Sequence, residues 1–288
     1  MASKAHLCSA TTWGSPLAPK TAVLIHGLSS NSQCWVTVAP ELVKQGYYVI
    51  APDLLGHGLA ARSNTYERDD LVEDILPQVS HRYIDLLIGH SLGGPVSLGL
   101  YPHLKTKPKR FVLVDPVSSH PLHLAMSLLT RRQSHSISPH KLTPHPQALE
   151  LSESEIEVIM RSDLENIKTR TSPQQFQERF PSWDPVTCVV KSMAVALADA
   201  EAVEYIGTKY RPWSCTKDLP PAASDGVEMV IIGADPLKDA VFKPAQADAL
   251  ARSHPDIKCI VAAGAGHSIQ RDDPKSIVRA ALEPLESL

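Results

Sequence analysis

The sequence predicts an α/β fold, in which a doubly wound and mostly parallel sheet carries an inserted helical cap. Three observations lead to this prediction. Six short apolar runs end at Gly, Pro or Asp, helical stretches lie between several of them, and the alternation stops between residues 117 and 223. Short runs rich in Val and Ile are typical of buried parallel strands, and alternating strands and helices build a sheet covered on both faces.

The expected strands are the apolar runs themselves, in chain order: Val23–Ile25, Tyr47–Ala51, Ile84–Ile88, Arg110–Val114, Glu228–Ile232 and Ile257–Ala262. The helical stretches of this part of the chain are Val36–Gln45, Asp69–Val79, Pro95–Leu100 and Pro244–Ser253. Pro95 is acceptable at the start of its helix because the first helical N–H groups have no intrahelical partner.

The segment 117–223 predicts a helical cap because it holds helical patterns and no convincing buried strand. The expected helices are Pro121–Arg131, Ser152–Arg161, Pro173–Phe180 and Val186–Leu197, and the tract Ser134–Pro146 is rich in Pro and polar residues. An insertion at this point covers the carboxyl edge of the sheet, where open α/β sheets bind ligands. The expected domains are therefore a core, first part, 1–116, the cap, 117–223, and a core, second part, 224–288.

Composition narrows the class of protein. The chain has 288 residues and a formal net charge of -3, so it carries no electrostatic footprint for nucleic acid. Its five cysteines are scattered, without the spacing of a zinc site, which favours reduced thiols. Neither a signal peptide nor an apolar run long enough to span a bilayer is visible, so a cytoplasmic protein without membrane contact is expected.

The stretch Leu86–Gly94 carries the most specific chemical signal. A short apolar run ends in Gly-His-Ser-Leu-Gly and is followed by small and aliphatic residues, which predicts a strand, a sharp turn and a helix. Gly89 and Gly93 leave room for the strained turn, and Ser91 lies at its tip beside the free N–H groups of a helix N-terminus. This G-x-S-x-G pattern is a nucleophile elbow and indicates acyl-transfer chemistry.

Over nearly its whole length the chain resembles the α/β-hydrolase superfamily. The motifs that carry the resemblance lie at strand ends in the family's order: His26-Gly27-Leu28 with Trp35, Asp53-Leu54-Leu55-Gly56-His57-Gly58, the elbow at Ser91, Gly233-Ala234-Asp235, and Gly266-His267. In the cap, Trp183-Asp184-Pro185 is similar to a segment often seen in the family. The resemblance implies structural roles for His26 and His57.

A serine hydroxyl needs an adjacent base, and His267 is the expected one, since it follows the last apolar run in a loop of small residues. A carboxylate must orient this imidazole. Asp235 holds the usual family position and is favoured, whereas Asp115, after Arg110–Val114, is the alternative acid. The resemblance also implies an oxyanion hole made by the backbone N–H groups of Leu28 and Leu92.

Three further residues are candidates for substrate contact: Ser29, His90 and Trp183. Several histidines gather in the cap, but no pattern of carboxylates or cysteines accompanies them, so no metal site is expected. They are His120, His123, His135, His140 and His145. The sequence has no G-x-G-x-x-G or phosphate-binding loop, and no cofactor is expected.

These observations predict a serine hydrolase that forms an acyl-enzyme with an ester, thioester or lactone of a small, mostly apolar compound. One alternative is a lactone-forming cyclase or acyltransferase with the same triad, similar to the fungal vibralactone-type cyclases of the superfamily. Others are a cofactor-free lyase and a non-catalytic ligand-binding protein on this fold. The expected partner is the small-molecule acyl substrate. A homodimer is compatible with the sequence, which does not identify the substrate or the oligomeric state.

Overall fold

The computed structural model describes residues 9–117, 153–208, 219 and 226–288. They form one sheet with strand order β1-β3-β2-β4-β5-β6-β7. The strands are β1 (Ala10–Trp13), β2 (Lys20–Ile25), β3 (Tyr47–Pro52), β4 (Leu86–His90), β5 (Arg110–Val114), β6 (Glu228–Ala234) and β7 (Lys258–Ala262). Strands β2 to β7 pair in parallel, and β1 runs antiparallel to β3 at the edge.

All six expected strands are present, which confirms the predicted fold class. Strand β1 was not predicted. Its sequence, Ala-Thr-Thr-Trp, is short and half polar, and most of its residues are only partly buried at the sheet edge. Such a strand gives no continuous apolar run, which is the signal used to identify buried strands.

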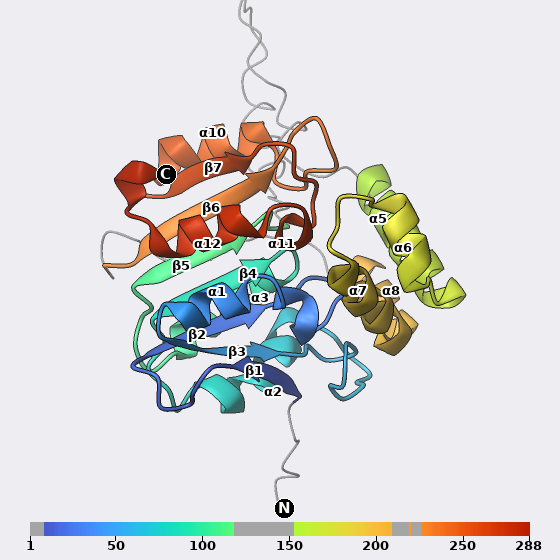
Figure 1. The fold of residues 1–288 in the computed structure, drawn as a ribbon, viewed down its shortest axis with the longest axis horizontal. Coiled ribbons are helices and arrows are strands. Elements are labelled where there is room, and N and C mark those ends of the chain that lie inside the picture. Colours follow the sequence, from blue (N-terminus) through green and yellow to red (C-terminus); the bar gives the residue numbers. More distant parts are fainter. Residues whose placement is uncertain (1–8, 118–152, 209–218, 220–225) are drawn as a thin grey trace, which may run out of the picture.

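Helices cover both faces of the sheet (Figure 1). On one face lie α2 (Arg68–Val79), α3 (Gly93–Leu100) and α10 (Pro244–Ser253), and on the other lie α1 (Ala39–Lys44), α11 (Ile269–Asp272) and α12 (Pro274–Leu282). Short 3₁₀ turns occur at η1 (Ser32–Trp35), η2 (Tyr101–His103) and η4 (Leu285–Ser287). Two buried apolar clusters, one on each face, result from this doubly wound arrangement.

Between β5 and β6 the described chain is helical, as expected for a cap. It contains α5 (Glu153–Thr169), α6 (Pro173–Arg179), α7 (Pro185–Leu197) and α8 (Ala200–Thr208), which lie beside the carboxyl ends of the strands (Figure 1). The cap has a small core of its own around Phe176, Trp183, Cys188 and Val195. Helix α8 was not predicted, and it joins the main core through Ala202 and Ile206.

Some sequence expectations fall outside the described residues. These are the helix Pro121–Arg131, the tract Ser134–Pro146 and the boundary between residues 223 and 224, so the domain limits stay predictions. Each helix in the described ranges is too short or too polar to cross a membrane.

Candidate active site

Ser91 lies on a strained turn between β4 and α3. Its backbone has a positive φ of 52°, a conformation that non-glycine residues adopt rarely and at a cost of roughly 1–3 kcal/mol. Flanking glycines make the turn possible, because a Cβ at Gly89 would collide with the Gly93 carbonyl and one at Gly93 with the Ile25 carbonyl. The strain is therefore stored where the turn lifts a hydroxyl out of the sheet edge.

His267 lies within hydrogen-bond distance of Ser91, as predicted. The distance between His267 Nε2 and Ser91 Oγ is 2.9 Å, and that between His267 Nδ1 and Asp115 Oδ2 is 2.6 Å. A carboxylate accepts only, so Nδ1 carries the proton and Nε2 is left to accept the Ser91 hydroxyl. This tautomer is the one a general base requires.

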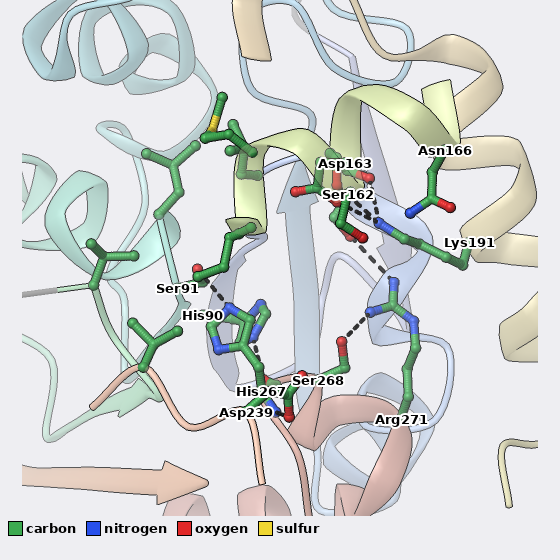
Figure 2. Close-up of a pocket in the computed structure, with 18 of the residues that line it drawn as sticks. His90, Ser91, Ser162, Asp163, Asn166, Lys191, Asp239, His267, Ser268 and Arg271 are labelled. Carbon is green, nitrogen blue, oxygen red and sulfur yellow. Dashed lines mark hydrogen bonds and ion pairs between the residues drawn. The ribbon is translucent and has the colours of Figure 1, made fainter. Parts of the chain in front are cut away.

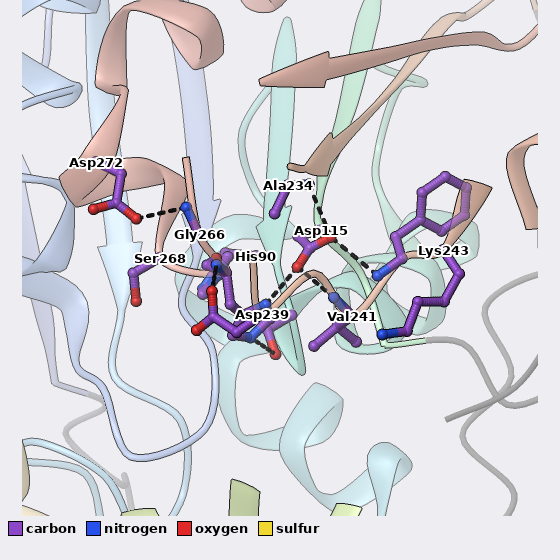
Figure 3. Close-up of polar contacts among 12 residues, drawn as sticks. His90, Asp115, Ala234, Asp239, Val241, Lys243, Gly266, Ser268 and Asp272 are labelled. Carbon is purple, nitrogen blue, oxygen red and sulfur yellow. Dashed lines mark hydrogen bonds and ion pairs between the residues drawn. The ribbon is translucent and has the colours of Figure 1, made fainter. Parts of the chain in front are cut away.

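The carboxylate of Asp115 is completely buried at the end of β5 and fixed by the backbone. Its Oδ1 accepts hydrogen bonds from the N–H groups of Ala234 (3.1 Å) and Phe242 (3.0 Å), and Oδ2 accepts one from Val241 (2.9 Å). Figure 3 shows these donors converging on the carboxylate. A buried anion needs such donors, and here they also orient the oxygen that meets the imidazole.

The preference for Asp235 as the partner of His267 was therefore wrong, and the alternative acid Asp115 has this place. Asp235 lies in the turn after β6, where its carboxylate accepts hydrogen bonds from the N–H groups of Leu237 (2.9 Å) and Gly264 (2.7 Å). These two backbone contacts lower the pKa of Asp235. The side chain closes turns and makes no hydrogen bond to the imidazole.

The loop that carries His267 is fixed from several sides. The His267 N–H donates to Asp239 Oδ1 (2.9 Å), and the His267 carbonyl accepts from His90 Nε2 (2.9 Å). Burial lowers the pKa of His267, but the hydrogen bond and the charge of Asp115 outweigh it, so the pKa of His267 is raised above its usual value of 6.5. The imidazole is thus held ready to take up a proton.

Leu28 and Leu92, the expected oxyanion-hole residues, both line a cavity of about 620 Å³ together with Ser91 and His267. Leu92 directly precedes α3 at its N-terminus. Gly27 brings the Leu28 loop against the elbow, since a Cβ at Gly27 would lie 2.9 Å from His90 Nδ1 and 3.0 Å from Ser91 Cβ. Both residues therefore line the cavity beside Ser91.

The three candidate substrate-contact residues also line this cavity, but each has a protein partner. Ser29, with a positive φ of 50°, accepts hydrogen bonds from Lys191. His90 positions the His267 loop, and burial holds the pKa of His90 well below its usual value. Trp183 stacks on Phe180 and donates from Nε1 to Asp272 Oδ1 at 2.7 Å.

Asp272 connects the cap to the histidine loop. Besides accepting from Trp183, it accepts a hydrogen bond from the Gly266 N–H at 2.9 Å. Asp272 therefore links Trp183 of the cap to the residue that directly precedes His267. His26 and His57 have the structural character expected of them: both are fully buried, and burial lowers the pKa of His26 to about 4.

Sequence reasoning missed two basic residues of the cavity, Lys191 on α7 and Arg271 on α11. Lys191 could have been noticed, because it is the only charged residue in the otherwise apolar helix Pro185–Leu197. Arg271, four positions after His267, gives no comparable signal. Burial lowers the pKa of both, to about 8 for Lys191.

Within the described residues, no group of His, Cys, Asp and Glu side chains could hold a metal ion. The cap histidines His120, His123, His135, His140 and His145 lie outside that part of the chain.

Comparison with curated proteins gives partial matches to hydrolases. A 3-hydroxybutyrate-oligomer hydrolase of Cupriavidus necator is 30% identical over 108 residues, 36% of each chain. A pyrethroid hydrolase of Sphingobium wenxiniae is 34% identical over 104 residues, 34% of this chain and 36% of that one. The aligned part thus spans little more than a third of these relatives.

Solved structures match the fold over most of the chain. An esterase from Exiguobacterium antarcticum has a TM-score of 0.66 at 14% identity, covering 96% of this chain and 94% of that one. The thioesterase domain from the curacin biosynthetic pathway has a TM-score of 0.61 at 18% identity, covering 93% and 92%. The model of the alpha/beta hydrolase family matches residues 22–280. The chain belongs to the alpha/beta hydrolase family.

Proposed function

We propose that this protein is a serine hydrolase that cleaves an ester, thioester or lactone of a small compound through an acyl-enzyme on Ser91. The observation that carries the proposal is the continuous relay from Ser91 Oγ to His267 Nε2 (2.9 Å) and from His267 Nδ1 to Asp115 Oδ2 (2.6 Å). A nucleophile, a base and an orienting acid in hydrogen-bond contact are the signature of nucleophilic acyl transfer.

In the proposed reaction, Ser91 Oγ attacks the acyl carbon while His267 Nε2 accepts the hydroxyl proton. The N–H groups of Leu28 and Leu92 stabilise the resulting oxyanion, an interaction worth several kcal/mol in comparable sites. His267 then gives its proton to the leaving alkoxide or thiolate, which leaves the acyl group on Ser91. A water molecule, deprotonated by His267, attacks this acyl-enzyme and releases the acid.

Labelling with a fluorophosphonate, followed by mass spectrometry of the protein, tests the nucleophile. We expect one adduct on Ser91, its loss in Ser91→Ala, and hydrolysis of short p-nitrophenyl esters by the unaltered chain but not by Ser91→Ala. Ser253→Ala, at an exposed serine on α10, is the matched control and should behave like the unaltered chain. Absence of both label and turnover would contradict the proposal.

The acceptor of the acyl group is tested separately with water enriched in ¹⁸O. A carboxylic acid product that contains one solvent oxygen supports hydrolysis. A cyclic product without solvent oxygen would instead assign the same triad to a lactone-forming cyclase or acyltransferase.

A further inference from the structure

One corner of the cavity carries positive charge that the relay of Ser91, His267 and Asp115 does not use. Lys191 from α7 and Arg271 from α11 lie on the same side of the cavity, and Arg271 lies beside Ser268 (Figure 2). We call Lys191 and Arg271, with Ser29, Ser30 and Asp163, the basic corner.

Arg271 is buried with few partners. Arg271 is only 6% exposed. Its guanidinium donates two long hydrogen bonds to hydroxyl groups, Ser268 Oγ (3.3 Å) and Ser30 Oγ (3.4 Å). The guanidinium carbon Cζ lies over the Trp183 ring, 5.3 Å from its centre, and Nε has no hydrogen-bond partner. Among the described residues, no carboxylate forms an ion pair with it.

A buried guanidinium with so few hydrogen-bond partners destabilises the folded protein unless an anion compensates its charge. Arginine offers five N–H donors in a planar fork that fits a carboxylate, whereas serine hydroxyls satisfy only part of it. Removing such a charge from water without an anionic partner is strongly unfavourable. The Arg271 side chain therefore has both the charge and the unused donor expected of an anion-binding group.

Lys191 reinforces the charge of this corner. Its ammonium donates to the Ser29 carbonyl (3.0 Å) and to Ser29 Oγ (2.9 Å), and it forms an ion pair with Asp163 at 3.8 Å. Asp163 is the one acidic member of the basic corner, so two cations face a single anion. Because Ser29 directly follows Leu28, Lys191 also ties the positive charge to the expected oxyanion loop.

Basic side chains also outnumber acidic ones in the described lining of the cavity as a whole. Among the described residues, its lining contains five basic side chains and two acidic ones, although the complete chain is acidic, with a net charge of -3. The basic ones are Arg179, Lys191, Lys238, Lys243 and Arg271, and the acidic ones are Asp163 and Asp239. A cleft lined by one sign of charge concentrates ligands of the opposite sign.

The lining also includes apolar residues, with Val117, Met160, Ile206 and Val241 among them. A cavity with an aliphatic part and a basic corner fits a ligand with both an apolar segment and an anionic end.

We propose that the substrate is an ester or thioester that also carries a carboxylate, and that Arg271 and Lys191 bind this carboxylate while Ser91 attacks the acyl carbon. The inference rests on the proposed function, since it names the substrate class of the same site. It extends the expectation of a mostly apolar substrate by adding a charged end. Arg271 is the specificity-determining residue in this arrangement.

Two pairs of alkyl esters test the proposal, because the members of each pair differ only in a terminal carboxylate or methyl group. Monomethyl glutarate against methyl pentanoate places the carboxylate on the acyl side, and γ-acetoxybutyrate against butyl acetate places it on the alcohol side. We expect kcat/KM to favour the carboxylate in one pair by about 10- to 100-fold, as for a hydrogen-bonded charge.

The variant Arg271→Gln should abolish this preference by lowering kcat/KM for the carboxylate ester, with little change for its neutral partner. Arg271→Lys should retain part of the preference. Arg279→Gln, on the exposed side of α12, is the matched control and should change neither ester. Equal turnover of both members in both pairs by the unaltered chain would overturn the proposal, even if Arg271→Gln fails to fold.

Binding to Ser91→Ala by calorimetry separates this proposal from the proposed function. We expect the carboxylate ester of the preferred pair to bind at least tenfold more tightly than its neutral partner, and the double variant with Arg271→Gln to lose the difference. This result with no turnover by the unaltered chain would reject the hydrolase and keep the carboxylate site. Turnover without any difference in binding or rate would reject the carboxylate site alone.

Discussion

The ends of β5 and β6 are similar in sequence, but the aspartates that follow them make different contacts in the structure. Each strand is buried and is followed within a few residues by an aspartate, Asp115 after β5 and Asp235 after β6. Asp115 is completely buried and meets the His267 imidazole, whereas Asp235 lies in a more exposed turn and meets only backbone N–H groups.

Strand order explains the difference. Strand β5 pairs directly with β4, which ends at the nucleophile elbow, while β6 lies one strand further away. The Asp115 N–H donates to the Ile232 carbonyl, and the Asp115 side chain accepts the Ala234 N–H, so the end of β6 serves as a support for this acid. The acid that contacts the imidazole is thus the one nearer the elbow, and the other shapes the loop.

The largest effect is expected for Asp115→Asn. An amide in this place cannot hold the His267 tautomer, and in a comparable triad the same exchange lowers kcat by about 10⁴-fold. We expect a loss of roughly 10³- to 10⁴-fold in kcat/KM for a preferred ester, measured by initial rates.

The same variant should also lose stability. The carboxylate accepts three backbone hydrogen bonds, and an amide nitrogen would face at least one of these donors, at a cost of about 1–3 kcal/mol. Denaturant unfolding measures this loss, and fluorophosphonate labelling of the folded variant shows that Ser91 is still present. Full activity of folded Asp115→Asn would remove Asp115 from the relay.

The pH dependence of kcat/KM gives a second test of the contact between Asp115 and His267, with a smaller expected effect. A general base must be unprotonated, and Asp115 raises the pKa of His267 above 6.5 against the opposing effect of burial. We therefore expect kcat/KM for a neutral ester to rise with pH and level off, with the inflection above pH 6.5. In Asp115→Asn the residual activity should show its inflection at lower pH. An unchanged inflection would mean that another group controls it.

Weakening the contact between the cap and the His267 loop should lower kcat/KM moderately. Asp272→Asn weakens the hydrogen bonds from Trp183 Nε1 and the Gly266 N–H, which together fix the loop before His267. We expect kcat/KM to fall by about tenfold, corresponding to one weakened hydrogen bond to a charged group. Asp273→Asn, at the neighbouring N-cap of α12, serves as the control for general destabilisation.

The sequence predicted the sheet and the contact between Ser91 and His267 well, because each depends on a local pattern. Buried parallel strands appear as apolar runs, and the G-x-S-x-G turn places Ser91 by steric necessity. His267 could be found since its loop follows the last strand. The choice between Asp115 and Asp235 depends on which strand neighbours the elbow, and a favoured family position decided it wrongly.

The basic corner could not be predicted from the sequence for a related reason. Lys191, Arg271 and Ser29 are far apart in the chain and meet only when α7 packs over the sheet edge. A lysine within an apolar helix is a local signal, but the identity of its partners is set by tertiary packing. The candidate Ser29 was placed in the cavity by sequence, although its role there is to bind Lys191.

The smallest effect is expected for Asp235→Asn, the variant that completes the comparison of the two acids. Asn can still accept the Leu237 or Gly264 N–H through its carbonyl oxygen, so the turn keeps one of its two side-chain bonds. We expect only a small loss in unfolding free energy and a change in kcat/KM of no more than about threefold. Because Asp235 is ionised with a lowered pKa in the folded protein, its contribution to stability is present above the unfolded pKa and disappears as the pH falls through the folded value. The difference in stability between Asp235→Asn and the unaltered chain should therefore shrink at acidic pH. A loss of activity as large as that of Asp115→Asn would show that the loop position set by Gly264 matters as much as the carboxylate on the imidazole, and the two strand ends would then be equivalent in function.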